Sequence, residues 1–116
     1  MVVSQVAYDD GVLRITHTGP ADLAIAGEID ESTHSGLVRT LQQLASGQRS
    51  VQIDLGGVTY CDLAGMRSIL SLGRTGPLDR PPGDTDLVLR DPPEQLRTIL
   101  QILGWDAAPG LTIADS

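Results

Sequence analysis

Residues 50–72 change from the hydrophobic period of a β-strand to that of an α-helix, and this change limits the possible folds more than any other part of the sequence. Apolar and polar residues alternate over 51–55, which predicts a strand, and Gly56-Gly57 then predicts a sharp turn that ends it. Apolar residues at helical spacing follow from Met66, and Asp62 stands where an N-cap is expected. A strand end, a polar turn and a helix N-terminus are therefore predicted to meet at one point on the surface.

The same criteria predict the remaining elements. A hairpin is expected around Asp9-Asp10-Gly11, because an Asp-Gly pair favours a tight turn between two strands. The Pro- and Gly-rich residues 74–85 predict a weakly structured surface loop. The predicted strands cover 2–8, 12–17, 23–29, 51–55, 86–90 and 111–114, and the predicted helices begin after Ser32-Thr33, Asp62 and Asp91-Pro92-Pro93.

The order of these elements predicts the fold class. Strand, helix and strand over 23–55 predict a right-handed crossover between two parallel strands. Ala24 and Ala26 in the first of these strands are small, which predicts that a helix packs closely against them. A length of 116 residues with 41% hydrophobic residues suits one domain over 1–116. We therefore expect a single α/β domain with a mixed β-sheet of four to six strands and three main helices packed mainly on one side.

The charge and composition of the chain exclude several classes of partner. The formal net charge is −7, whereas nucleic-acid surfaces carry clustered Lys and Arg, so no nucleic-acid partner is expected. One Cys and two His leave no ligand set for a structural metal. No apolar run has the length of a membrane span and no leader pattern is present, so we expect a cytoplasmic protein without a membrane span.

The candidate catalytic residues do not form a constellation. Cys61 has no His near it in sequence and is interpreted as a small core or turn residue. Glu28 and Asp30 form a pair of carboxylates without a His, Cys or basic partner nearby, and we interpret them as solvent-facing or capping groups. Phosphate-loop and nucleophile-elbow motifs are absent. No enzyme and no cofactor are expected; the alternative, a hydrolytic carboxylate pair, predicts turnover that falls on Asp→Asn substitution.

Two motifs carry a resemblance to a known family. Residues 53–67 read I-D-L-x-x-V-x-x-x-D-x-A-G-M-R, and residues 27–30 read G-E-I-D. In this order, about thirty residues apart, they resemble the STAS domains of bacterial anti-sigma-factor antagonists over almost the whole chain. The resemblance implies a STAS-like fold and a protein-interaction module that binds a kinase-like anti-sigma factor and so releases a sigma factor.

The resemblance also implies a docking surface, because relatives use the turn and helix start after the second motif strand. Residue by residue it implies partner contacts by Asp30, Thr59, Tyr60, Asp62, Leu63, Ala64, Met66 and Arg67. Regulated relatives carry a phosphorylatable Ser or Thr directly after the Asp, where this chain has Leu63 followed by Ala64. No phosphorylation is therefore expected at Leu63, and Thr59 stays open as an alternate acceptor. The sequence does not decide whether Leu63 is exposed or buried, whereas Met66 is expected to be buried.

A second hypothesis keeps the fold and changes the function. The STAS-like component of lipid-transport ABC assemblies, or of stress-sensing scaffolds, is a structural subunit that requires no phosphorylation. The loss of both hydroxyls at 63 and 64 fits this hypothesis as well as a constitutive antagonist. Co-purification with a kinase-like anti-sigma factor, or with a transporter ATPase or scaffold protein, separates the two. A homodimer is also left open by the sequence.

Overall fold

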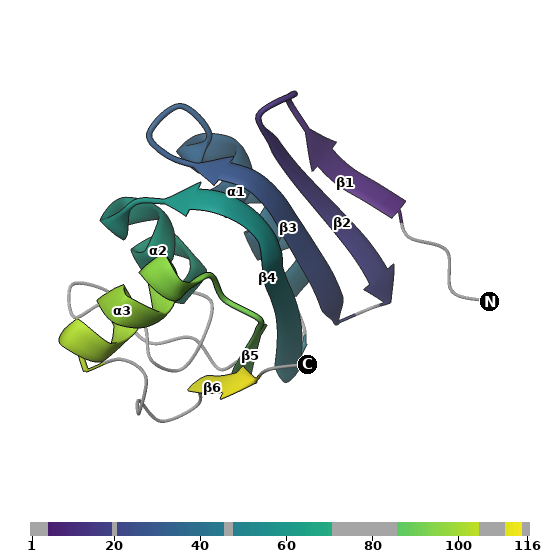
Figure 1. Cartoon of the computed structure of the whole chain (residues 1–116). Helices are drawn as coiled ribbons and strands as arrows, with labels where there is room; N and C mark the ends of the chain where they lie inside the picture. Colours follow the sequence, from purple (N-terminus) through teal and green to yellow (C-terminus); the bar gives the residue numbers. More distant parts are fainter. Residues whose placement is uncertain (1–4, 20, 46–47, 71–85, 105–110, 115–116) are drawn as a thin grey trace.

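The computed structural model describes residues 5–19, 21–45, 48–70, 86–104 and 111–114. The predicted loop at 74–85 lies outside the described residues. In chain order the elements are β1 (Gln5–Asp9), β2 (Leu13–Gly19), β3 (Asp22–Ile29), α1 (His34–Ala45), β4 (Ser50–Cys61), α2 (Leu63–Leu70), β5 (Asp86–Arg90), α3 (Glu94–Ile102) and β6 (Leu111–Ala114) (Figure 1).

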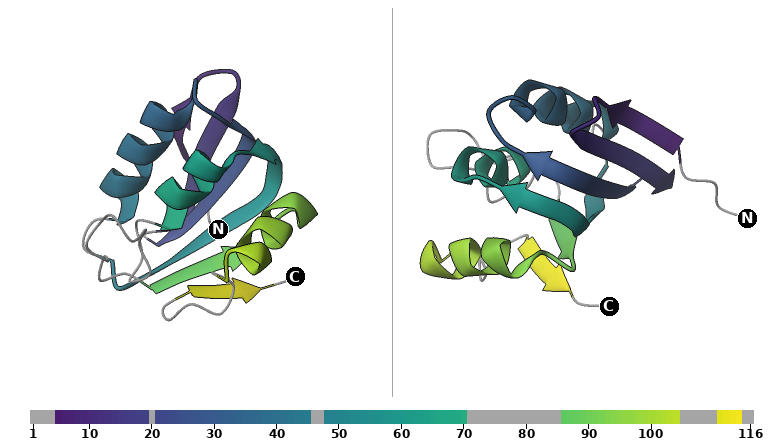
Figure 2. Two further views of the ribbon diagram at one scale, coloured as in Figure 1. Left: turned by 90° about the vertical axis from the view of Figure 1, so that its left-hand side faces the viewer. Right: turned by 45° about the horizontal axis from the view of Figure 1, so that its top comes forward.

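The six strands form one mixed sheet in the order β1-β2-β3-β4-β5-β6. The β1–β2 and β2–β3 pairs are antiparallel, and the β3–β4, β4–β5 and β5–β6 pairs are parallel. The three helices lie on one side of this sheet (Figure 2). The predicted α/β domain, with its mixed sheet and its parallel pair around the first helix, is confirmed.

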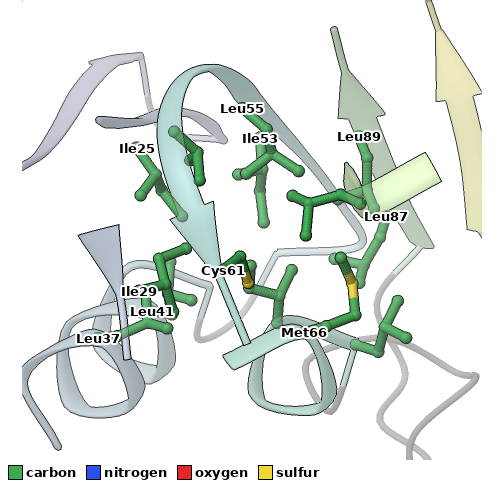
Figure 3. Packing of buried hydrophobic residues seen from close by; sticks show 14 of the residues in the cluster. Ile25, Ile29, Leu37, Leu41, Ile53, Leu55, Cys61, Met66, Leu87 and Leu89 are labelled. Carbon is green, nitrogen blue, oxygen red and sulfur yellow. The ribbon is translucent and has the colours of Figure 1, made fainter. Parts of the chain in front are cut away.

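The core lies between the helices and the sheet face that they cover. Leu37 and Leu41 of α1, one helical turn apart, have no exposed surface, and neither do Ile53 and Leu55 of β4. Figure 3 shows these side chains converging with Met66 of α2. Full burial of one such aliphatic side chain contributes about 1.5–3 kcal/mol, so this one cluster supplies most of the apolar driving force for folding.

β4 does not end where the sequence predicted. It continues through Gly56-Gly57 to Cys61 and contains two irregularities in its pairing with β3. At each one, an extra residue of β4 shifts the side-chain alternation, so that Val58 and Cys61 point to the core although they are spaced by three. These are β-bulges, which bend a strand without ending it. The predicted turn at Gly56-Gly57 is therefore wrong, and the strand carries the chain directly to α2.

Two smaller predictions about packing also differ from the structure. Ala24 and Ala26 lie on the sheet face away from the buried cluster, with Ala26 exposed, so they do not receive a helix. A side chain at Gly57 would place its Cβ 2.9 Å from the Cβ of Ala26, so small residues at these positions let β3 and β4 approach on the open face. The helical spacing of Leu96, Ile99, Leu100 and Leu103 predicts that all four face the core, but Leu103, directly after α3, is 43% exposed, whereas Leu100 is buried.

The predicted β1–β2 hairpin is confirmed, and its turn is held by one carboxylate. The Asp10 carboxylate accepts hydrogen bonds from the backbone N–H groups of Val12 and Leu13, at 2.9 and 2.8 Å. It also accepts a bond from the Tyr8 hydroxyl at 2.8 Å. These bonds to the charged form hold the pKa of Asp10 below its usual value.

Candidate functional site

The parallel strands β3 and β4 end side by side, and a helix begins directly after each of them. Ile29, the last residue of β3, is paired with Cys61, the last residue of β4. The N–H of Asp62 then donates a hydrogen bond to the Ile29 carbonyl at 3.1 Å, which extends the pairing by one residue. Because neighbouring strands are about 5 Å apart, Asp30 and Asp62 are adjacent at the carboxyl-terminal ends of these two strands. Figure 1 shows both strand-to-helix connections at the same end of the molecule.

Asp62 is the N-cap of α2, as the sequence predicted. Its Oδ1 accepts a hydrogen bond from the Gly65 N–H at 2.7 Å, and its backbone carbonyl accepts the N–H of Met66 at 3.1 Å. The side chain thus satisfies an N–H group that has no partner inside the helix. A carboxylate at this position also interacts favourably with the positive end of the helix dipole.

Asp30 holds the turn that connects β3 to α1, four residues before the helix begins at His34. Its Oδ1 accepts hydrogen bonds from the Ser32 N–H at 2.9 Å and the Ser32 hydroxyl at 2.6 Å. The hydrogen bond from the Ser32 hydroxyl, followed by those from backbone N–H groups, lowers the pKa of Asp30. Thr33, which is 1% exposed, donates its hydroxyl to the Glu28 carbonyl at 3.0 Å and closes the turn. Asp30 therefore caps this turn, while the Thr33 carbonyl accepts the first hydrogen bond of α1, from the Leu37 N–H at 3.0 Å, and Glu28 is exposed.

Two glycines in the sequence motifs bring these elements into close contact. Gly27 has a φ of +104°, and a Cβ there would lie 2.0 Å from the Val12 carbonyl oxygen of the hairpin turn. Gly65 sits in the first turn of α2, where a Cβ would lie 2.3 Å from Cγ2 of Ile29. Only glycine permits both approaches. Gly65 therefore fixes how close the start of α2 lies to the end of β3.

Several polar and apolar side chains are left exposed around the two helix starts. Leu63, the first residue of α2, is 48% exposed, and Tyr60 near the end of β4 is 43% exposed. The sequence did not decide whether Leu63 is exposed or buried, and the structure places it on the surface. An open depression beside them is lined by Asp30, Glu31, Ser32 and Asp62. We refer to Asp30, Glu31, Ser32, Tyr60, Asp62, Leu63 and Ala64 together as the helix-entrance surface.

The other residues that the resemblance implied are placed differently. Met66 is fully buried, as expected, and lies inside the cluster in Figure 3, so it is not part of the surface. Thr59 is the extra residue of the second β4 bulge, and its hydroxyl donates to the Gly27 carbonyl at 3.2 Å. Arg67 is exposed on α2, one turn after Leu63. The helix-entrance surface thus gains Glu31 and Ser32, which the sequence did not single out.

One side-chain contact between the two helices was not foreseen. Nε2 of His34, the first residue of α1, is hydrogen-bonded to the hydroxyl of Ser68 in α2. The same hydroxyl donates to the Ala64 carbonyl at 2.9 Å, so His34 donates to Ser68 when both bonds are made. The pair ties the two helices together behind the helix-entrance surface. The residues are 34 positions apart, and no local pattern in the sequence announces such a contact.

The chemistry of the described residues offers little for catalysis at this end of the molecule. Cys61 is 1% exposed, and burial, followed by the neighbouring Asp62 charge, raises its pKa to about 12. A thiol in that state is a poor nucleophile at neutral pH. Among the described residues, no group of His, Cys, Asp or Glu could hold a metal ion. None of the described helices is long and apolar enough to cross a membrane.

Comparisons with known proteins agree with this architecture. The family model described as Mlab, STAS domain, matches residues 14–113. A crystal structure of an anti-sigma factor antagonist from Mycobacterium paratuberculosis superposes with a TM-score of 0.62 at 18% sequence identity, covering 97% of this chain and 86% of the other. That likeness establishes a shared fold. No curated protein matches the sequence. Because the family model matches 100 of the 116 residues, from 14 to 113, the chain belongs to the STAS domain family.

Proposed function

We propose that this chain is a protein-docking module of the anti-sigma-factor-antagonist kind, which binds a kinase-like anti-sigma factor through the helix-entrance surface and so releases a sigma factor. The observation that carries the proposal is the exposure of Leu63 at the first position of a helix whose other large apolar residues, Met66, Ile69 and Leu70, are buried. A partner that covers this leucine removes its apolar surface from water, and a rigid, capped helix start holds the side chain in place for that contact. Membership of the STAS family and the likeness to an antagonist structure support the same reading.

A docking function fits the chemistry of the site better than an enzymatic one. Asp62 uses Oδ1 to cap α2 and Asp30 uses Oδ1 to hold the turn before α1, so both carboxylates are held in structural hydrogen bonds. The buried Cys61 has a raised pKa and no access to a substrate. Removing a proton or attacking a substrate requires a group with a matched pKa and a reachable geometry. Binding without turnover is the function that these residues support.

We further propose that the usual phosphorylation switch does not operate at the start of α2. Leu63 and Ala64 have no oxygen nucleophile, so a partner kinase and ATP should leave residues 62–65 unmodified. Thr59 stays the alternate phosphate acceptor, although its hydroxyl donates a hydrogen bond to the Gly27 carbonyl. Mass spectrometry after incubation with the partner and ATP decides this point. A phosphopeptide that maps to Thr59 would mean that the switch has moved within the same surface.

A fixed structural subunit, as in a lipid-transport ABC assembly or a stress-sensing scaffold, is the second candidate. The exposed Leu63 favours it as well, because a permanent interface gains from an apolar residue where a switch requires a hydroxyl.

Affinity capture of a C-terminally tagged chain from its native cells separates these functions. The proposal predicts a kinase-like anti-sigma factor in the eluate. Recovery of a transporter ATPase or a scaffold protein in its place would support the second candidate and contradict the first.

A further inference from the structure

α1 and α2 lie side by side on one face of the sheet (Figure 2), and a hydroxyl group meets an imidazole between them. Nε2 of His34 and Oγ of Ser68 are within hydrogen-bond distance, and both side chains are half-buried, so each keeps some exposed surface. Among the hydroxyl groups of the described residues, that of Ser68 is the one bonded to an imidazole. A hydroxyl and a base within reach of each other have the geometry of an activated nucleophile.

The Ser68 hydroxyl can be held in two ways, and the tautomer of His34 decides between them. With the imidazole proton on Nε2, His34 donates to Ser68, which in turn donates to the Ala64 carbonyl at 2.9 Å. With the proton on Nδ1, Nε2 is an acceptor and the Ser68 hydroxyl donates to it. Moving one proton between the ring nitrogens therefore converts a structural hydroxyl into one that faces a base.

The two helices that meet at this contact carry no carboxylate, although the whole chain is acidic. α1 and α2 together hold two Arg, one His and no Asp or Glu, in a chain with 15 acidic residues and a net charge of −7. His34 is also the first residue of α1, where the positive end of the helix dipole favours an anion. Within this pair of helices, an anionic group on Ser68 would face basic and not acidic side chains.

We propose that Ser68 is a phosphorylation site, with His34 as its base and afterwards as its counter-ion. Oγ of Ser68 attacks the γ-phosphorus of ATP held by a protein serine kinase, a new P–O bond forms, and the bond to the leaving ADP breaks. The Oγ proton passes to Nε2 of His34, so that an imidazolium lies beside a phosphate that carries about −2 charges. The site is separate from Leu63 and Thr59, and the inference does not depend on which partner binds the helix-entrance surface.

Phosphorylation would change how the two helices are joined. The bond from the Ser68 hydroxyl to the Ala64 carbonyl is lost, because the phosphorylated oxygen has no proton to donate. It is replaced by charge-assisted bonds from His34, which are roughly twice as strong as bonds between neutral groups. Since Ala64 belongs to the helix-entrance surface, the modification acts on the first turn of α2 from behind that surface.

The first test maps the phosphate on the chain itself. The recombinant chain is incubated with ATP and clarified lysates of its native cells, taken from growing and from starved cultures. It is then digested with trypsin and sequenced by mass spectrometry. Trypsin leaves Ser68 and Ser71 in one peptide, so fragment ions must separate the two positions. We expect the phosphate on Ser68, with Ser71 unmodified.

Two variants test the part that His34 plays in the transfer. His34→Gln keeps a hydrogen-bonding side chain and removes the base, so the initial rate of phosphorylation should fall about 100-fold, the lower end of what a general base contributes. Ser35→Ala is the matched control, because it removes an exposed hydroxyl from the next position of α1 and leaves His34 in place. It should be phosphorylated at the rate of the parent. Circular dichroism melts establish that both variants are folded.

A second measurement tests the counter-ion. The chain is produced with Ser68→phosphoserine encoded directly, both with His34 and with His34→Gln, and thermal melts are compared with those of the two unmodified chains. The phosphoserine chain should lose more of its melting temperature on His34→Gln than the unmodified chain does. The reason is that the imidazolium then pairs with a dianion and not with a neutral hydroxyl.

The results that would overturn the proposal are specific. An absence of phosphate at Ser68 with both lysates, a phosphate on Ser71 or Thr59 alone, or an unchanged rate in folded His34→Gln would remove the site. Equal losses of melting temperature on His34→Gln would remove the counter-ion. Affinity capture of the partner tests the proposed function separately, so the failure of one is not mistaken for the failure of the other.

Discussion

Replacement of Gly65 by alanine tests the packing that sets the helix-entrance surface. The new Cβ would lie 2.3 Å from Cγ2 of Ile29, more than 1 Å inside the usual contact distance of about 3.5–4.0 Å. Ile29 is fully buried at the end of β3, so the strain is relieved only if the first turn of α2 moves. Overpacking of this kind costs up to about 3 kcal/mol, and the better helix propensity of Ala returns about 1 kcal/mol. We expect a net loss of about 2 kcal/mol.

The assay is thermal unfolding followed by circular dichroism. For 116 residues the unfolding entropy is about 0.24 kcal/mol/K, so a loss of 2 kcal/mol lowers the melting temperature by about 8 °C. Gly36→Ala is the matched control: it also lies at the third position of a helix, and its Cβ would lie 2.3 Å from the ring of Tyr8. That ring is half-buried on edge strand β1 and can turn away, so we expect no more than about 1 kcal/mol. A Gly65→Ala protein as stable as the parent would refute the packing argument.

Three further predictions concern the caps, the thiol and the carboxylates. Asp62→Ala should lower stability by about 0.5–2 kcal/mol in denaturant titrations, and an unchanged midpoint would mean that the bond to the Gly65 N–H contributes nothing. Cys61, with a pKa raised to about 12, should react with a thiol reagent at pH 8 only as fast as the protein unfolds, so rapid native labelling would contradict its burial. Because Asp10 and Asp30 have pKa values lowered from 3.8, their contribution to stability is complete above that pH and is lost as the pH falls through their folded values. In acid titrations Asp10→Asn should therefore flatten the fall in stability below about pH 4, and a parallel curve would exclude Asp10 as a source.

The sequence predicted the elements whose signals are local. The Asp10 turn, the Asp62 cap and the apolar spacing of α1 each act within a few residues, and all three are present in the structure. The length of β4 was mispredicted because Gly56-Gly57 has the composition of a turn. Its extended form depends on pairing with β3 through two bulges, which is a tertiary interaction.

The site was predicted in part for the same reason. Asp62 was found because an N-cap has a local signature, and Asp30 was found through the family resemblance of the G-E-I-D motif. The depression that joins them depends on the parallel pairing of Ile29 with Cys61, so Glu31 and Ser32 gained significance only from the fold. The His34–Ser68 contact links two helices and has no sequence period to reveal it. Exposure of Leu63 likewise follows from the direction in which α2 leaves the sheet.

Leu63→Ser tests the central claim that the helix-entrance surface is the docking site. The variant should fold, because Leu63 is 48% exposed and Ser is tolerated in a first helical turn. Ile102→Ser is the control, since it removes an apolar side chain that is 77% exposed at the end of α3.

The decisive measurement is calorimetric titration of the co-purified partner, without ATP, into the parent chain and into both variants. Loss of a leucine buried in an interface costs about 1.5–3 kcal/mol, so Leu63→Ser should bind about 10- to 150-fold more weakly, and Ile102→Ser should bind as the parent does. A folded Leu63→Ser protein that binds its partner as tightly as the parent would contradict the account.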